Sequence, residues 1–297
     1  MKIFDLNKRN NVDIVIALGF FDSIHVGHTS IIKKAQELAK DLRACSAVFT
    51  FENDIDKVVG GSTGLVLTFE ERLKKLSKLS VDSVVSTVFT KEFSKLSPFE
   101  FFNLLVENFN VKAIACGRDY RFGYKGSGDV ELMKGLCIDR GIHLLVVDDV
   151  TLNLTRVSTT QIKEFLLQGN IQKANILLGE NYSISGVVTR GRAVGREMGF
   201  PTANVLIASE KLKIKNGVYK TRVEIDGKEY KCITNYGARP TFNLEEVLTE
   251  TYIDGFKGDL YDKNITIYFD EYIRECVKFD SVEQLILQLQ KDVEKIR

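Results

Sequence analysis

Hydrophobic and polar residues alternate with two different periods along the first half of the chain. Short apolar runs rich in β-branched residues predict buried strands, and stretches with apolar residues three and four positions apart predict amphipathic helices. The expected strands span residues 12–18, 45–51, 84–89, 113–116 and 143–147. The expected helices span residues 30–43, 68–79, 97–108, 130–140, 159–168 and 171–178.

This succession of strands and helices predicts a parallel sheet with helices on its faces. In such folds the ligand binds in a crevice at the carboxyl ends of the strands. We therefore expect a Rossmann-like α/β domain whose functional residues directly follow its strands.

The pattern changes near residue 181, where short strands separated by turns begin. Strands are expected at residues 184–188, 217–225, 230–234, 247–253 and 265–269, with a hairpin signal at Asp226-Gly227. One last amphipathic helix is expected at residues 281–296. The second half is therefore expected to be an all-β barrel or sandwich with a C-terminal helix, which gives two domains, 1–181 and 182–297.

Charge and cysteine content narrow the class of protein. The 297 residues carry 41 Lys+Arg and 40 Asp+Glu, a formal net charge of +1, whereas proteins that bind nucleic acids or membrane surfaces need a basic excess. No apolar run approaches the ~20 residues of a membrane span, and the first residues lack the apolar core of a secretion signal. The five cysteines form no C-x-x-C pair, so we expect reduced thiols. We expect a cytoplasmic protein, monomeric or weakly homo-oligomeric, that binds neither nucleic acid nor membrane.

Two of the three histidines lie three residues apart between the first strand and the first helix, in Gly19-Phe-Phe-Asp-Ser-Ile-His-Val-Gly-His28. A helix N-terminus attracts phosphates, and two imidazoles there could donate hydrogen bonds to the charge that develops as pyrophosphate leaves. Gly27 would keep the backbone low beneath a ligand. Two alternatives stay open: His25 and His28 could cap and pack the helix, or they could bind a metal, although the His-Glu-x-x-His zinc motif is missing.

Two later segments of the first half have side chains that suit a nucleotide and a flat ring. Small hydroxyls and a lysine at a helix start can bind ATP phosphates, and polar and aromatic residues after a strand can hold a ring. The ordinary alternatives are an N-cap cluster and a flexible glycine loop. The residues concerned are Ser158, Thr159, Thr160 and Lys163 in one segment, and Asp119, Tyr120 and Phe122 in the other.

Glycines and arginines gather between residues 186 and 204, and the stretch ends in Thr-Ala-Asn. Glycines let backbone amides approach phosphates, and the side-chain oxygens of Thr202 and Asn204 suit Mg²⁺. A plain turn at Pro201-Thr202 is the alternative. The Walker pattern is absent from the chain, so a different kinase architecture is needed. The expected phosphate-binding residues here are Gly191, Arg192, Gly195 and Arg196.

The motifs of the first half together resemble one known family. Residues 19–28 are similar to the Gly-x-Phe-Asp-x-x-His-x-Gly-His signature of the nucleotidyltransferase superfamily, in the form carried by bifunctional bacterial riboflavin kinases/FMN adenylyltransferases, also called FAD synthetases. Residues 117–129 and 157–163 resemble that family's Gly-x-Asp-Phe-x-Phe-Gly and Ile-Ser-Ser-Thr-x-Ile-Arg segments. The resemblance implies that His25 and His28 are catalytic. It also implies ATP contacts at Gly19, Phe20, Asp22, Gly27, Ser158, Thr159, Thr160 and Lys163.

The second half resembles the riboflavin kinase part of the same family. Residues 199–204 are similar to its Gly-Phe-Pro-Thr-Ala-Asn motif, whose Thr and Asn contact the metal and the nucleotide phosphates. Residues 249–261 resemble the segment whose glutamate is the catalytic base, and that glutamate is by position Glu250. The resemblance implies flavin-binding residues at Asp119, Tyr120, Phe122, Asn235 and Arg274.

Several positions depart from the family pattern. Phe-Glu-Asn-Asp-Ile at residues 51–55 stands in place of Phe-x-Pro-His-Pro, Ser23 in place of a glycine, and Lys163 in place of an arginine, which loses a bidentate fork. In the second half, Cys276 stands where a glutamate would be, and Asp262 replaces a glycine.

The resemblance implies a nucleotidyltransferase-like α/β domain followed by a riboflavin-kinase-like closed barrel. It implies that ATP phosphorylates riboflavin to FMN, that ATP then adenylylates FMN to FAD with release of pyrophosphate, and that both steps need Mg²⁺. Two alternatives remain: a riboflavin kinase with an impaired N-terminal domain, and a non-catalytic flavin-sensing regulator.

Overall fold

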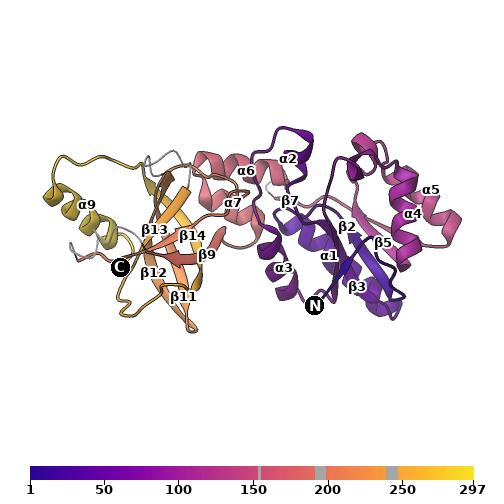
Figure 1. Cartoon of the computed structure of the whole chain (residues 1–297), viewed down its shortest axis with the longest axis horizontal. Coiled ribbons are helices and arrows are strands. Elements are labelled where there is room, and N and C mark those ends of the chain that lie inside the picture. The colour runs from indigo at the N-terminus through magenta and orange to yellow at the C-terminus, as the bar shows by residue number, and fades with distance from the viewer. Residues whose placement is uncertain (153–154, 191–198, 239–246) are drawn as a thin grey trace. The chain divides into compact units, whose positions relative to one another are not determined.

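The computed structural model describes residues 1–152, 155–190, 199–238 and 247–297, and it divides the chain into two compact units, Met1–Thr159 and Thr160–Arg297 (Figure 1). The expected phosphate-binding residues Gly191, Arg192, Gly195 and Arg196 lie outside the described residues. Within those ranges, no helix is both long and apolar enough to cross a membrane.

The first unit is built on a six-stranded parallel sheet, which confirms the predicted α/β class. Its strand order is β1-β4-β3-β2-β5-β6. The chain moves outward from β2 to β3 and β4, then returns to place β5 on the other side of β2, so the order reverses between β2 and β5. A ligand crevice is expected at that reversal. The strands are β1 Lys2–Asp5, β2 Asp13–Leu18, β3 Cys45–Phe51, β4 Ser83–Thr87, β5 Asn110–Gly117 and β6 His143–Val147.

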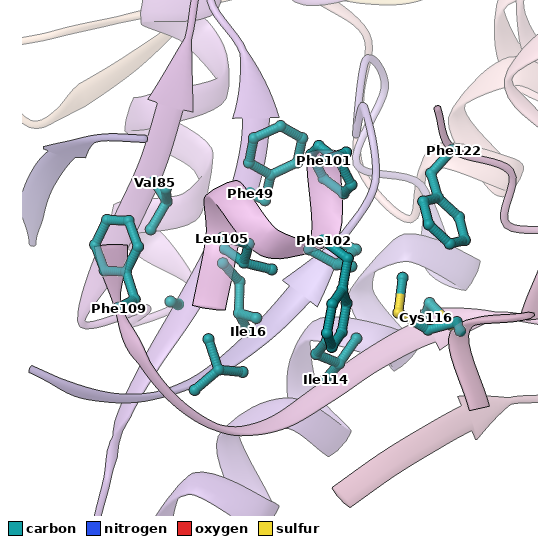
Figure 2. Close-up of a cluster of buried hydrophobic side chains, with 14 of the residues drawn as sticks. Ile16, Phe49, Val85, Phe101, Phe102, Leu105, Phe109, Ile114, Cys116 and Phe122 are labelled. Atoms are coloured by element: carbon teal, nitrogen blue, oxygen red, sulfur yellow. The ribbon is translucent and has the colours of Figure 1, made fainter. Parts of the chain in front are cut away.

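Helices cover both faces of this sheet. Helix α1 (Val26–Asp41) contacts β2, β3 and β5 on one face, and α4 (Pro98–Asn108) and α5 (Val130–Arg140) close the hydrophobic core on the other. Alternate residues of each strand point to opposite faces, so the apolar runs of the central strands serve both layers. Figure 2 shows side chains of the core between the sheet and helices α4 and α5, among them Ile16, Phe49, Phe101, Phe102, Leu105 and Ile114.

Local capping explains where the helices begin. Thr68 and Ser97 each form a capping box, with Glu71 and Glu100, at the starts of α3 (Phe69–Lys78) and α4. The prediction that the first helix starts at residue 30 is wrong, because His25 caps a helix that already begins at Val26. Several elements were not expected from the sequence, among them β1, the short helix α2 (Ile55–Val59), and the antiparallel pair of β7 (Thr151–Leu152) and β8 (Thr155–Arg156).

The second unit closes an antiparallel barrel, so the barrel rather than the sandwich is correct. Helices α6 (Thr159–Gln168) and α7 (Ile171–Leu178) precede it with the predicted bounds. The barrel order is β10-β13-β12-β11-β14-β9. The hairpin at Asp226-Gly227 is confirmed, with φ of 52° and 76° at its two residues. The strands are β9 Ser183–Thr189, β10 Thr202–Leu206, β11 Gly217–Ile225, β12 Lys228–Ala238, β13 Val247–Ile253 and β14 Asn264–Arg274.

The barrel has a buried interior and a helix on its outer face. Inside, the hydroxyl groups of Thr221, Thr234 and Thr251 form a chain of hydrogen bonds of 2.7 and 2.9 Å, which satisfies these buried polar groups. Outside, the C-terminal helix α9 (Val282–Glu294) contributes to a small apolar cluster. Val218 and Ile233 of the barrel strands and Val293 and Ile296 of the C-terminal segment make up this cluster.

Candidate active sites

His25 and His28 form a stacked pair where β2 passes into α1. Their ring centroids are 3.7 Å apart with planes inclined by 12°. His25 Nδ1 accepts the backbone N–H of His28 at 3.1 Å, so an imidazole performs the capping that Ser, Asp or Asn usually performs. A Cβ atom on Gly27 would come within 3.0 Å of the His25 ring. Glycine at this position therefore leaves room for the ring to fold over the helix start.

Both imidazoles are held neutral. Burial, followed by the nearby Lys75 ammonium, lowers the pKa of His25 from 6.5 to about 4. Burial, the His25 ring and Lys75 lower the pKa of His28 well below 6.5. Because His25 Nδ1 accepts a hydrogen bond, the single ring proton of neutral His25 sits on Nε2, which is left as a donor for a ligand.

The turn before the histidines is strained and tied down. Phe21 and Ile24 have φ of 53° and 42°, a left-handed conformation that bulky and β-branched residues rarely adopt. Buried Asp22 holds the neighbouring loop, because its Oδ1 accepts the backbone N–H groups of Val66 and Leu67 at 2.8 and 3.3 Å. The motif thus encodes a fixed turn as well as the residues expected to bind a ligand.

The serine that replaces the family's glycine has a defined partner. Ser23 Oγ and Thr159 Oγ1 are 2.9 Å apart and share a hydrogen bond. This contact brings the histidine turn together with the Ser158-Thr159 segment in the first unit, as expected for two halves of one phosphate site. Thr160 and Lys163 lie on α6, on the other side of the boundary between the units.

The loop after β5 contributes the residues expected to bind the flavin. Asp119 is ion-paired with Arg156, which also binds Asp149 at 3.1 Å. Tyr120 and Phe122 stack with centroids 5.7 Å apart, and Phe122 is only 5% exposed within the core. Asp119 lies close enough to His25 to act on its pKa, so this loop and the histidine pair are near each other in the first unit.

The altered stretch at residues 51–55 also has structural partners. The Asn53 side chain binds the Phe89 backbone twice, through Nδ2 to the carbonyl at 3.0 Å and through Oδ1 from the N–H at 2.7 Å. Asp54 caps α2 by accepting the N–H of Asp56 at 3.0 Å. Asn53 thus extends the pairing of β3 with β4 by side-chain contacts, and Asp54 begins the helix that follows.

Sequence reasoning missed two cations of α3 that reach the turn. Arg72 donates to the carbonyl of Phe20 at 3.0 Å and to Thr50 Oγ1 at 2.6 Å. Lys75 donates to the carbonyl of Ser23 at 3.4 Å. Their spacing of three residues on an amphipathic helix is a signal, but in the sequence it cannot be distinguished from an ordinary solvated face.

In the second unit, three of the expected site residues form one row across neighbouring strands. Asn204 of β10 is opposite Glu250 of β13, which is opposite Asn235 of β12. Directly opposed residues point to the same face of a sheet. The adjacent residues Thr249 and Thr251 are fully buried inside the barrel, so the row lies on the outer face. Thr202, two residues before Asn204, shares this face and is exposed.

The same face continues toward α9. Beyond Asn235 the register reaches Val218 and then Arg274 on β14. The Arg274 guanidinium binds both carboxylate oxygens of Asp292 in α9, with Nη2 at 2.6 Å, and Asp292 is fully buried. Arg274, expected to bind the flavin, therefore also anchors the helix.

The exposed Cys276 lies beside this row. Its thiol donates to Asn235 Oδ1 at 3.1 Å. A thiol donor at the position of the family's glutamate thus fixes the orientation of the Asn235 amide.

The donor set of the row fits a hard cation that completes its coordination with phosphate. Thr202 and Asn204 present neutral oxygens beside the carboxylate of Glu250 on one face. Among the described residues, no group of three or more His, Cys, Asp or Glu side chains could hold a metal ion. Oxygen ligands shared with substrate phosphates are typical of Mg²⁺, which keeps few protein ligands.

Comparisons with known proteins match both halves of the chain. A family model described as FAD synthetase covers residues 7–161, and one described as riboflavin kinase covers residues 178–297. A bifunctional riboflavin kinase/FMN adenylyltransferase of Listeria monocytogenes is 33% identical over 99% of this chain and 92% of its own length. The protein of the same description from Bacillus subtilis is 30% identical over 97% of this chain and 92% of its own length.

A solved structure has the same fold from end to end. The structure, described as a macrolide-efflux protein from Streptococcus pneumoniae, superposes with a TM-score of 0.89 at 29% identity, covering 100% of this chain and 99% of that one.

Proposed function

The chain belongs to the family of bifunctional riboflavin kinases/FMN adenylyltransferases, and from this membership we propose that it makes FMN and then FAD in two sites, one in each unit. Its function is flavin cofactor biosynthesis. The observation that carries the proposal is that each unit holds its own set of reacting groups: a neutral histidine pair at a helix start in one, and the Asn204–Glu250–Asn235 row in the other.

In the first unit, ATP adenylylates FMN. An FMN phosphate oxygen forms a bond with the α-phosphorus of ATP, and the bond from that phosphorus to the bridging oxygen breaks, which releases pyrophosphate. His25 Nε2–H and the start of α1 stabilise the negative charge on the phosphates. No side chain has to give or take a proton, which agrees with two imidazoles whose pKa values are lowered. Asp119 and Tyr120 hold the flavin beside the reacting phosphates.

In the second unit, ATP phosphorylates riboflavin. Glu250 accepts the proton of the ribityl 5′-hydroxyl as its oxygen attacks the γ-phosphorus, and ADP leaves. Asn235 and Arg274 orient the flavin on the face that also carries α9. Thr202 and Asn204 would hold Mg²⁺ together with the ATP phosphates, where the ion would supply positive charge to neutralise them.

The substrates follow from the same assignment. ATP, riboflavin and FMN are small molecules, and the near-zero net charge supports a protein that does not bind nucleic acid. We also propose that the protein is a monomer or a weak homo-oligomer.

Chromatography of flavins tests the proposal. The purified protein is incubated with ATP and Mg²⁺, starting from riboflavin in one tube and from FMN in the other. We expect FAD in both. FMN alone in the first tube, with no FAD in either, would identify a riboflavin kinase whose altered N-terminal motifs have lost adenylyl transfer. No conversion in either tube, with flavin still bound, would identify a sensor.

A further inference from the structure

Two cationic side chains of helix α3 donate hydrogen bonds to the histidine turn, residues 19–25. Arg72 and Lys75 are three residues apart and therefore lie on one side of the helix. Arg72 donates to the carbonyl of Phe20 at 3.0 Å, and Lys75 donates to the carbonyl of Ser23 at 3.4 Å. Arg72 thus binds the beginning of the turn that precedes His25, and Lys75 binds its middle.

The two cations differ in what surrounds them. Arg72 is fully buried, its guanidinium lies 4.9 Å from the centroid of the Phe20 ring, and the carboxylates of Asp22 and Asp54 act on its charge. Burial lowers the pKa of Arg72 from 12.5 to about 10. This charge is enclosed in the protein and compensated there, so Arg72 holds the turn in shape.

Lys75 instead lies where the turn meets the Ser158-Thr159 segment. Its Nζ donates to the carbonyl of Ser23 at 3.4 Å, and Ser23 Oγ shares a hydrogen bond of 2.9 Å with Thr159 Oγ1. Lys75 is only partly buried, and its ammonium also lowers the pKa of both His25 and His28. The ammonium therefore lies beside the two segments that are expected to bind the phosphates of ATP.

We propose that Lys75 is a further phosphate-binding residue of the adenylyl-transfer site, whose ammonium stabilises the polyphosphate of ATP and the departing pyrophosphate; this inference rests on the proposed function of the first unit. The neutral histidines supply donors without a full charge, and α1 supplies only the partial charge of a helix end. A compact lysine ammonium is well suited to phosphate oxygens. The nearby carboxylate of Asp119 is compensated by Arg156, so it does not cancel this field.

Two substitutions separate a charge on the phosphates from a hydrogen bond to the turn. Lys75→Gln can still donate to the carbonyl of Ser23 but carries no charge. Lys75→Arg keeps the positive charge but replaces the compact ammonium by a planar guanidinium. Lys74→Gln is the matched control, because Lys74 is the preceding residue on the same helix and is exposed.

The first measurement is the rate of FAD formation from FMN, with FMN formation from riboflavin as an internal control in the same molecule. We expect Lys75→Gln to lower kcat/KM for ATP in FAD formation by about 10- to 100-fold, by analogy with the loss of one transition-state donor. Lys75→Arg should retain most of the activity, and Lys74→Gln and riboflavin phosphorylation should stay unchanged. Activity of Lys75→Gln within about twofold of the wild type, or equal losses in Lys75→Gln and Lys75→Arg, would overturn the proposal.

The pH profile tests whether the charge of Lys75 acts at the histidine pair. The charged groups facing His25 are Lys75 from α3, Asp119 from the loop after β5, and Arg156 from β8, and those facing His28 are His25 and Lys75. Removing the Lys75 charge should raise the pKa of both histidines toward 6.5, so the acid limb of FAD formation should move to higher pH in Lys75→Gln. An unmoved limb in a slower variant would contradict the proposal.

Pyrophosphate binding keeps the inference separate from the proposed function. If the wild type makes no FAD, the adenylyl-transfer proposal fails, but calorimetric titration with Mg²⁺-pyrophosphate still tests Lys75. We expect at least about tenfold weaker binding in Lys75→Gln than in Lys74→Gln. Equal binding by the two variants would overturn the assignment of Lys75.

Discussion

His25 combines three roles in one side chain. Its Nδ1 caps α1, its ring stacks 3.7 Å from the His28 ring, and it folds over Gly27, where a Cβ would approach it within 3.0 Å. These contacts fix both the ring orientation and the tautomer. A neutral donor is therefore available at a defined position before any ligand arrives, which is the condition for electrostatic stabilisation without reorganisation.

Acid should destabilise the first unit through His25. The pKa of His25 is lowered from 6.5 to about 4, so the unfolded chain binds the proton first as pH falls. Stability is therefore complete above about pH 6.5 and is lost between about 6.5 and 4, by roughly 3 kcal/mol for this shift. Urea unfolding followed by circular dichroism at a series of pH values measures the loss. His25→Asn, which keeps a capping side chain, should weaken the dependence and leave the part due to His28, whose pKa is also lowered, whereas a variant of the exposed His143, His143→Gln, should leave it unchanged. The same pH dependence in His25→Asn and the wild type would exclude His25 as its source.

Removing the proposed base should separate the two activities. Glu250→Gln keeps the size of the side chain but cannot accept the ribityl proton, so FMN formation should fall by at least about 100-fold. FAD formation from supplied FMN should remain, because the histidine site lies in the other unit. Initial rates of both reactions are the measurement. Glu224→Gln, an exposed carboxylate elsewhere on the barrel, is the control, and equal activity of both variants would exclude Glu250 as the base.

The residue types of the candidate sites could be predicted from the sequence, but their partners could not. The spacing of His25 and His28 identifies the start of a helix that can bind phosphate. That Ser23 meets Thr159, or that Lys75 reaches the carbonyl of Ser23, depends on strand order, which no local pattern contains. Asn53 is similar: its departure from the family motif is visible, but its pairing with the Phe89 backbone follows only from the β3–β4 register.

At the scale of elements, regular amphipathic periods were sufficient to predict where helices begin and end. Segments without a regular period were not all predicted correctly. The helices at 130–140, 159–168 and 171–178 have the predicted bounds, because caps or glycines coincide with the ends of their periods. The strand β10 was not expected, since Gly-Phe-Pro-Thr reads as a turn. Cross-strand pairing with β13 overrides that local preference.

Helix α9 depends on one buried ion pair. Asp292 is fully buried and binds the Arg274 guanidinium, and Gln288 Nε2 donates to Asp292 Oδ1 at 2.9 Å. Asp292→Ala leaves the arginine unpaired in a poorly solvated position, so the barrel unit should lose about 3 kcal/mol in unfolding free energy. Riboflavin phosphorylation should fall with it, since Arg274 shares the outer face with Asn235. Urea unfolding and initial rates check this, with the exposed Glu294→Ala as control; a loss under about 1 kcal/mol would mean that apolar packing alone holds the helix.

At the scale of the whole molecule, the residues proposed for the two chemistries form separate sets. The histidine turn, the loop after β5 and the Ser158-Thr159 segment all belong to Met1–Thr159, and the Asn204–Glu250–Asn235 row belongs to Thr160–Arg297. Each unit also has an apolar cluster of its own. The product of one site, FMN, is the substrate of the other, so the two sites are linked by a small molecule.

Mixing two single-site variants tests whether that link is a freely diffusing intermediate. Glu250→Gln alone should make FAD only from FMN, and His28→Ala alone should make only FMN from riboflavin. Because each variant retains one intact unit, an equal mixture supplied with riboflavin should produce FAD after a lag in which FMN accumulates in solution. The lag should shorten as the concentration of the Glu250→Gln variant is raised. Time courses of the separated flavins measure both quantities. The wild type supplied with riboflavin should show the same lag, and FAD formed by the wild type without accumulation of free FMN would mean that FMN passes directly between the sites of a single chain.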